Sequence, residues 1–275
     1  MGDKKSYTSS FARIYDDIMS SVPYDLWYKY LQELLNSYDK DPDKIMDMAC
    51  GTGNMSLRFA QDHKDIVGID KSSSMLEIAR QKIQKNECDI TFFQKDVRNF
   101  NFPRQFDFVF CIFDSLNYIL NIKDLEKVFS NVYKSLKKNG IFIFDLNTVS
   151  RLMSIEPGTT VFSGKNYTCF WEDIIDLKQT TWKVQLKIYF NDDQSQYFEE
   201  IHKETGYKKE DIISLLTSVG FSKVKVYKAF TFDEGKDSDN RLYYIVCKNN
   251  LQEKKLSFLS RFKKKVKWKL LSSCD

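Results

Sequence analysis

Two glycines separated by one residue, Gly51 and Gly53, follow a short apolar segment that ends at Ala49. Glycine lacks a Cβ atom, so the backbone can turn tightly here and approach a ligand closely. If a helix begins after this loop, its free N–H groups can donate hydrogen bonds to the same ligand. The loop by itself is weak evidence of a site, because glycines are also common in ordinary turns.

Two carboxylates stand at matching places further along the chain. Asp70 ends the next apolar segment, and Asp96 ends the one after it. A carboxylate in the place of Asp70 can accept hydrogen bonds from both hydroxyls of a ribose. At Asp96, the carboxylate and the backbone N–H of Val97 suit the Watson–Crick edge of an adenine. Each motif alone is equally well explained as a turn, but three in succession indicate a site for a cofactor that contains adenosine.

Predicted strands and helices alternate along the part of the chain that contains these residues. Short apolar runs predict strands, and stretches with helical spacing between them predict helices. The predicted strands are 44–49, 66–69, 90–94, 106–113 and 140–146, and the predicted helices are 54–62, 72–86 and 125–138. We expect Asn139 and Gly140 to end the last of these helices. This alternation predicts a parallel sheet, whose strands present their carboxyl ends, and hence the ligand site, at one edge.

The pattern changes after Asn147, where segments rich in Trp, Tyr, Thr and Ile follow one another at 167–175, 180–190 and 196–204. The alternation of apolar and polar residues in 182–188 is typical of a half-buried strand. We therefore expect an antiparallel insertion of about three strands. After the insertion, the sequence predicts a further helix and two further strands, at 208–219, 223–232 and 241–248.

The glycine loop helps to distinguish two cofactor classes. Nicotinamide enzymes prefer G-x-G-x-x-G, and here Ser56 stands where the third glycine would be. The segment D-M-A-C-G-T-G at 47–53 instead resembles motif I of class I S-adenosylmethionine-dependent methyltransferases. Three further segments resemble the ribose, adenine-edge and fourth-strand motifs of that family: G-I-D at 68–70 with Met75, K-D-V at 95–97, and F-D-F-V-F-C at 106–111. The resemblance covers residues 7–248 and is specific for the cofactor but not for the acceptor.

This resemblance implies S-adenosylmethionine as the cofactor and S-adenosylhomocysteine as its product. The cofactor-binding residues that it implies are Tyr15, Asp47, Ala49, Gly51, Gly53, Asp70, Lys71, Met75, Asp96, Val97 and Cys111. The implied fold is α/β, a Rossmann-like seven-stranded and mostly parallel sheet whose last strand is antiparallel. The expected organisation is a helical lid at 1–40, a methyltransferase domain at 41–148 and 205–250, an antiparallel insertion on the substrate side at 149–204, and a basic tail at 251–275.

A narrower resemblance concerns bacterial small-molecule methyltransferases, which include sugar and glycine N-methyltransferases. It rests on F-A-x-x-Y-D at 11–16, F-D-S-L-N-Y at 113–118, D-L-N at 145–147 and E-x-H-x-x-x-x-Y at 200–207. In the sugar enzymes a histidine falls near the place that Tyr118 occupies here. The resemblance implies a small-molecule acceptor.

Methyl transfer is an in-line displacement at a sulfonium carbon, so the protein mainly holds the two reactants together and excludes water. A base is needed only if the nucleophile arrives protonated. The candidates for this catalytic role are Asp114, Tyr118, Glu200 and His202. For His202 we give a surface or cross-strand role about twice the weight of a role as base, because this residue lies in a strand of alternating polar and apolar residues. Whether the acceptor atom is nitrogen or oxygen stays open.

Two other functions remain open: a catalytically silent protein that binds S-adenosylmethionine and serves a partner, and, less favoured, a nicotinamide-dependent oxidoreductase. Nucleic acid is not expected as a partner, because no N/D-P-P-Y or Pro-Cys motif is present and the body has no basic stripe. A metal site is not expected either, since the chain has two His and no C-x-x-C.

The charge of the chain is unevenly distributed. The 275 residues carry a net charge of +4, but 251–275 alone hold eight basic and two acidic side chains. The segment 254–271 is basic and amphipathic, so it can contact an anionic membrane or an acidic partner, or remain a solvated tail. No apolar run approaches the ~20 residues of a membrane span, no secretory signal opens the chain, and most cysteines lie in apolar runs. We expect a cytoplasmic protein; its oligomeric state stays open.

Overall fold

The computed structural model describes residues 6–86, 88–191 and 193–249. Its helices are α1 (Ser9–Ile18), α2 (Tyr24–Ser37), α3 (Asn54–Ala60), α4 (Ser73–Asn86), α5 (Ile122–Ser135), α6 (Val149–Met153) and α7 (Lys209–Val219), with the 3₁₀ helices η1 (Met19–Ser21) and η2 (Ser115–Tyr118). The main sheet contains β1 (Lys44–Met48), β2 (Asp65–Asp70), β3 (Ile90–Gln94), β4 (Phe106–Cys111), β5 (Leu136–Asn147), β10 (Lys223–Lys228) and β11 (Arg241–Cys247). The second sheet contains β6 (Gly158–Gly164), β7 (Tyr167–Asp176), β8 (Thr181–Phe190) and β9 (Asp193–Thr205).

The main sheet has the strand order β10-β11-β5-β4-β1-β2-β3. Strands β1 to β5 run parallel, whereas β11 is antiparallel to both β5 and β10. The predicted seven-stranded, mostly parallel sheet with an antiparallel last strand is therefore confirmed. The order reverses between β1 and β4, and such a switch point is where open α/β sheets bind ligands.

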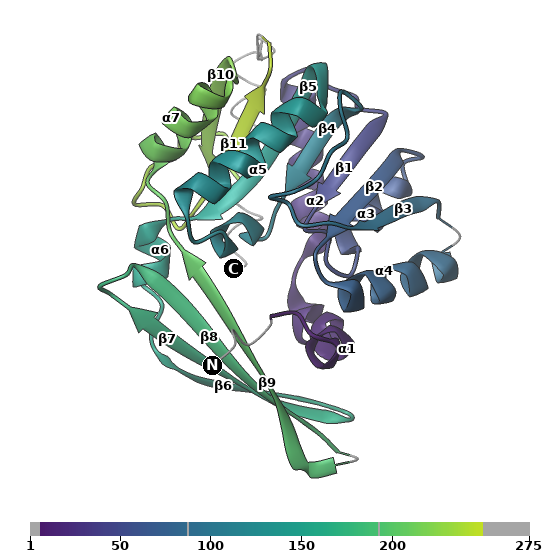
Figure 1. Cartoon of the computed structure of the whole chain (residues 1–275), viewed down its shortest axis with the longest axis vertical. Coiled ribbons are helices and arrows are strands. Elements are labelled where there is room, and N and C mark those ends of the chain that lie inside the picture. The colour runs from purple at the N-terminus through teal and green to yellow at the C-terminus, as the bar shows by residue number, and fades with distance from the viewer. Residues whose placement is uncertain (1–5, 87, 192, 250–275) are drawn as a thin grey trace.

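Helices cover both faces of the main sheet (Figure 1). Alternate side chains of β5 point to opposite faces of the sheet. Ile143 packs with side chains of α2, α3 and α4, whereas Phe142 and Phe144 pack with side chains of α5 and α7. Strands buried on both faces are predicted by continuous apolar runs, which is why the sequence located them well.

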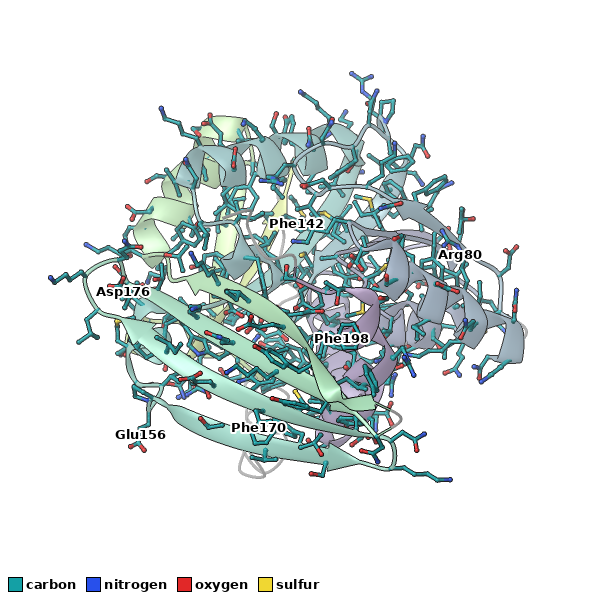
Figure 2. The ribbon with its side chains drawn as sticks, turned by 60° about the horizontal axis from the view of Figure 1, so that its bottom comes forward. Arg80, Phe142, Glu156, Phe170, Asp176 and Phe198 are labelled. Atoms are coloured by element: carbon teal, nitrogen blue, oxygen red, sulfur yellow. The ribbon has the colours of Figure 1, made fainter. Side chains whose placement is uncertain are left out.

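The second sheet is antiparallel throughout, and α1 packs on it rather than on the main sheet. Figure 2 shows this sheet facing the viewer, with Phe170 and Phe198 on it and Phe142 within the main sheet above. The insertion was expected to have about three strands, and it has four. The additional strand is β6, whose side chains are mostly exposed Thr, Ser and Gly at the edge of the sheet, so it lacks the apolar alternation that predicts a strand.

The predicted end of the helix at 125–138 is wrong. Helix α5 ends at Ser135, and β5 begins at Leu136, which pairs with Phe106. The carbonyls of Lys134 and Ser135 accept the backbone N–H groups of Arg104 and Gln105 at 2.9 and 2.8 Å. These tertiary hydrogen bonds satisfy the last turn of α5, so the helix does not need a glycine cap.

The division of the chain into a lid, a methyltransferase domain and an insertion stays a proposal, and so does the beginning of the insertion at residue 149. The four strands of the second sheet lie within residues 158–205. The predicted basic tail at 251–275 lies outside the described residues. Within the described part of the chain, no helix is long and apolar enough to cross a membrane.

Candidate functional site

The first of two adjoining cavities, here called the strand-end cavity, lies where β1, β2, β3 and β4 end. Its volume is about 220 Å³. Its lining consists of Tyr7, Tyr15, Tyr24, Asp47, Ala49, Cys50, Gly51, Thr52, Asn54, Met55, Asp70, Lys71, Met75, Asp96, Val97, Arg98, Ile112, Phe113, Ser115, Tyr118 and Ile119. Most of the cofactor-binding residues predicted from the sequence are therefore brought together in one place.

The carboxylate of Asp70 is held by two backbone groups. It accepts the N–H of Gly51 at 2.9 Å and that of Ser72 at 2.7 Å. Gly51 has a positive φ of 53°, a conformation that glycine adopts without strain. Burial raises the pKa of Asp70, although both N–H groups act in the opposite direction. The glycine turn thus orients a carboxylate whose remaining lone pairs can accept hydroxyl groups.

Two further carboxylates line the cavity in different environments. Asp47 is buried and accepts the hydroxyl of Ser56 at 2.5 Å, and its burial raises its pKa to about 7. Asp96 accepts two hydrogen bonds from the guanidinium of Arg98, at 2.9 and 2.6 Å, and this pairing lowers the pKa of Asp96. Arg98 therefore holds Asp96 ionised beside Val97 at the edge of the cavity.

Two predicted cofactor residues do not line the cavity. Cys111 is fully buried in the core beside α5, because successive side chains of β4 point to opposite faces, and its neighbour Ile112 lines the cavity instead. Gly53 begins α3 with a φ of 76°, and a Cβ atom there would lie 3.1 Å from Phe92 and 3.2 Å from Ala79. The absence of a Cβ atom at Gly53 therefore permits close packing of the loop against Phe92 and Ala79.

Local sequence patterns did not indicate several residues of this cavity, and two of these residues come from the first 40 residues of the chain. Tyr7 and Tyr24 flank α1 and belong to no local motif. The available signal was Asp16 of the F-A-x-x-Y-D segment, whose carboxylate accepts Thr52 Oγ1 at 2.7 Å and lies 2.8 Å from Lys82 Nζ. The other missed lining residues are Cys50, Thr52, Asn54, Met55, Arg98, Ile112, Phe113, Ser115 and Ile119.

The second cavity, here called the inner chamber, lies beside the first and has a volume of about 860 Å³. Its lining consists of Tyr7, Phe11, Tyr15, Met19, Val22, Pro23, Trp27, Phe113, Asp114, Tyr118, Asn147, Arg151, Ile155, Trp171, Trp182, Val184, His202, Glu204, Lys228, Ala229, Phe230, Thr231, Ser238, Asp239, Asn240 and Arg241. Four residues line both cavities: Tyr7, Tyr15, Phe113 and Tyr118. The two spaces thus meet at an aromatic junction.

A chain of hydrogen bonds crosses this junction. The hydroxyl of Tyr7 donates to the oxygen of Tyr118 at 2.9 Å, and the oxygen of Tyr118 lies 3.2 Å from Nδ1 of His202. Burial raises the pKa of Tyr118 well above its usual value. Two of the predicted catalytic candidates, Tyr118 and His202, are therefore in direct contact at the wall of the inner chamber.

Glu200 takes a different position from the one expected of a base. Its carboxylate accepts the backbone N–H of Tyr7 at 2.7 Å and that of Thr8 at 2.8 Å, and it also accepts the hydroxyl of Thr8. Burial raises the pKa of Glu200, but the nearby imidazole of His202 and the hydrogen bonds from Thr8 outweigh it, and the net shift in the pKa is downward. With Nε2 of His202 3.2 Å away, Glu200 connects the lid to His202 and does not line the chamber.

Asp114, the fourth catalytic candidate, lies in a strained loop after β4. Both Phe113 and Asp114 have left-handed backbone conformations, with φ of 59° and 50°. Non-glycine residues seldom adopt this conformation, and it is concentrated at functional sites. Asp114 is held there by Asn147 Nδ2 at 2.6 Å and Arg241 Nη1 at 3.3 Å. The loop directs a carboxylate and an aromatic ring to the junction.

Among the described residues, no group of three or more His, Cys, Asp or Glu side chains is arranged to hold a metal ion. The polar groups of the strand-end cavity are instead suited to an organic ligand, with Asp70 as a hydrogen-bond acceptor and the loop at Gly51 closely opposed to it. An adenosine group fits this donor and acceptor set.

Comparisons with known proteins agree with this arrangement. A family model described as a methyltransferase domain matches residues 45–140. YqeM of Bacillus subtilis (strain 168), a protein assigned to the methyltransferases, is 30% identical over 242 residues, which cover 87% of this chain and 96% of YqeM.

Solved structures and a further relative extend the comparison. The crystal structure of an S-adenosylmethionine-dependent methyltransferase from Clostridium acetobutylicum is 28% identical and superposes with a TM-score of 0.75, covering 87% of this chain and 98% of that one. The dTDP-4-amino-2,3,4,6-tetradeoxy-D-glucose N,N-dimethyltransferase of Saccharopolyspora spinosa is 28% identical over 142 residues, which cover 50% of this chain and 55% of that enzyme.

Proposed function

Since the chain belongs to the S-adenosylmethionine-dependent methyltransferases, we propose that it methylates a nitrogen or oxygen atom of a small molecule bound in the inner chamber. The observation that carries this proposal is the aromatic junction, where Tyr7, Tyr15 and Tyr118 line both cavities. A donor in one cavity and an acceptor in the other would meet there, between half-buried aromatic rings that limit the access of water.

In this proposal the strand-end cavity holds the cofactor. Asp70 accepts the ribose hydroxyls, while Asp96 and Val97 face the edge of the adenine. Tyr15 covers the amino-acid end, and Met75 packs against the adenine ring. When bound, S-adenosylmethionine supplies an activated methyl group on a sulfonium, so the protein needs to add little chemistry of its own beyond positioning.

The Tyr118–His202 pair is the proposed route for a proton when the nucleophile arrives protonated. The oxygen of Tyr118 already accepts a hydrogen bond from Tyr7 and contacts Nδ1 of His202. It can therefore accept a proton from the acceptor while its own proton moves to His202. Glu200, 3.2 Å from Nε2, would stabilise the imidazolium that results.

A nitrogen acceptor has support from the Saccharopolyspora spinosa relative, which by its name methylates an amino sugar. We also propose a cytoplasmic location, since the cysteines that the structure describes are free.

The test combines cofactor binding with an acceptor screen. Isothermal titration should give micromolar binding of S-adenosylhomocysteine, and methyl-labelled S-adenosylmethionine should label at least one member of a panel of amines, alcohols and carboxylic acids. Binding without transfer to any acceptor would favour the catalytically silent alternative. Binding of NAD in place of S-adenosylhomocysteine would overturn the proposal.

A further inference from the structure

Glu204, near the end of β9, is a buried carboxylate for which the sequence motifs provide no role. Its side chain lines the inner chamber, and the residue is only 4% exposed. Its Oε2 has no hydrogen-bond partner among the described residues. A buried carboxylate oxygen without a partner costs free energy unless a ligand satisfies it.

The charged side chains that act on Glu204 include two carboxylates and one guanidinium. Asp114 and Asp145 lie close enough to interact electrostatically with Glu204. The described residues place a single cationic side chain, Arg241, in ion-pair contact with these carboxylates, 3.3 Å from Asp114 and hydrogen-bonded to Asp145. Oδ1 of Asp145 also lacks a hydrogen-bond partner in the described part of the chain. Arg241 therefore pairs with Asp114 and Asp145, whereas no ion pair within the described part of the chain reaches Glu204, so a bound cation would satisfy its carboxylate.

Aromatic rings complete this part of the chamber. Trp171 and Trp182 line it, and their indole N–H groups both donate to Oδ1 of Asp173, at 3.1 and 2.9 Å. This shared acceptor holds both indole rings in place. Trp27 and Phe113 also line the chamber and stack with centroids 4.1 Å apart. Aromatic faces attract a cation and accommodate an apolar body attached to it.

We propose that Glu204, together with Asp114, binds the positively charged amino group of the acceptor, so that the inner chamber selects amines over alcohols and acids. This inference rests on the proposed function and names the substrate class for it. In the reaction, the ammonium loses one N–H proton to Tyr118, which passes its own proton to His202. The nitrogen lone pair then forms the new N–C bond as the S–CH3 bond breaks and its electron pair returns to sulfur. The positive charge of the sulfonium ends on the methylated nitrogen.

The geometry is consistent with this order of events. Glu204 and His202 are two residues apart on β9 and line the same chamber. The negative charge of Glu204 raises the pKa of Tyr7 and that of Tyr118. An ammonium held between Glu204 and Asp114 would therefore lie next to the junction with the strand-end cavity. Burial, together with the negative charge of Asp114, raises the pKa of Glu204, and a bound ammonium would counteract this shift.

The experiment measures binding of matched probes to the full chain saturated with S-adenosylhomocysteine. Cyclohexylamine, cyclohexanol and cyclohexanecarboxylate have the same ring and differ in the polar group. We expect cyclohexylamine to bind about tenfold or more tightly than cyclohexanol, and cyclohexanecarboxylate not to bind. Glu204→Gln should remove this preference for the amine and leave the affinities for cyclohexanol and S-adenosylhomocysteine unchanged. The matched control Glu172→Gln, at an exposed position of β7 in the same sheet, should behave as wild type.

A pH series provides a second measurement that needs no variant. The charged or titratable groups that act on Glu204 or line the chamber with it are Asp114, Asp145, Arg241, Tyr7, Tyr118, Tyr15, His202, Arg151, Lys228 and Asp239. Because Glu204 must ionise to pair with the ammonium, and burial raises the pKa of Glu204, the affinity of the wild type for cyclohexylamine should rise with increasing pH. Equal affinities for the amine and the alcohol, or an amine preference that survives in Glu204→Gln, would overturn the inference. Methyl transfer to an alcohol with Glu204→Gln fully active would also overturn it while leaving the proposed function intact. Failure to bind S-adenosylhomocysteine at all would count against the function itself.

Discussion

Oε1 of Glu200 accepts the backbone N–H of Thr8 at 2.8 Å, although the two residues are 192 positions apart in the chain. This contact fastens the beginning of α1 to β9, and a carboxylate next to a helix N-terminus is stabilised by the free N–H groups there. α1 and the segment before it supply Tyr7 and Tyr15 to both cavities, and α1 lies against the second sheet (Figure 1).

Glu200→Gln should therefore weaken cofactor binding, although Glu200 does not line the strand-end cavity. Gln retains one acceptor oxygen but loses the charge and the second acceptor, and a lost charged hydrogen bond costs about 1.5–3 kcal/mol. We expect a lower melting temperature and about tenfold weaker binding of S-adenosylhomocysteine. Differential scanning fluorimetry and isothermal titration measure the two effects, with Glu172→Gln as the control. Wild-type values of both would show that the lid does not depend on this contact.

Asp70→Ala should weaken S-adenosylhomocysteine binding by about 2–3 kcal/mol, because it removes a charged acceptor that two hydroxyls would share. The variant also frees the N–H groups of Gly51 and Ser72, so a change in the loop is expected as well. Asp89→Asn, at an exposed site before β3, is the control. Isothermal titration gives the two dissociation constants, and equal values would remove Asp70 from the cofactor site.

Asp47 should make the stability of the cofactor-free protein depend on pH. Its pKa is raised to about 7 in the folded chain from an ordinary value of 3.8. The folded state therefore binds more protons than the unfolded state, and this stabilisation is fully present below pH ~4 and lost as the pH rises to about 7. Asp47→Asn cannot titrate, so its free energy of unfolding should fall less over this range, by up to about 4 kcal/mol.

Urea denaturation of both proteins between pH 4 and pH 8 measures this difference. Some dependence on pH should persist in Asp47→Asn, because burial also raises the pKa of Asp145 to about 6. Parallel curves for wild type and Asp47→Asn would mean that Asp47 does not titrate in this range.

Tyr118→Phe and His202→Gln should both slow methyl transfer by about a hundredfold, because general-base catalysis contributes 10²–10⁴. Since the two side chains form one proton route, the double variant should be no slower than the slower single variant. Single-turnover transfer from labelled S-adenosylmethionine measures the rates, and Tyr197→Phe, exposed on β9, is the control. Rate losses that multiply in the double variant would indicate two independent roles.

Local sequence patterns predicted the main sheet and many of the residues that line the strand-end cavity. Asp70 and Asp96 could be placed together from the sequence because parallel strands bring their carboxyl ends to one edge, whatever the length of the connections. Cys111, which the fourth-strand motif implied, does not line the cavity, because a residue near a strand end can face either side of the sheet and the motif does not tell which.

The α/β class, the glycine loop and the presence of an antiparallel insertion follow from local patterns, since each depends on residues close together in the chain. The contacts of Tyr7, Glu200 and Glu204 became visible only in the folded chain. Tyr7 contacts Tyr118 across 111 positions, and Glu200, a catalytic candidate from its motif, accepts the backbone N–H groups of Tyr7 and Thr8. Glu204 becomes notable only because folding buries its carboxylate without a partner. Burial and long-range hydrogen bonds depend on which surfaces the fold brings together, and no local spacing of residues encodes that.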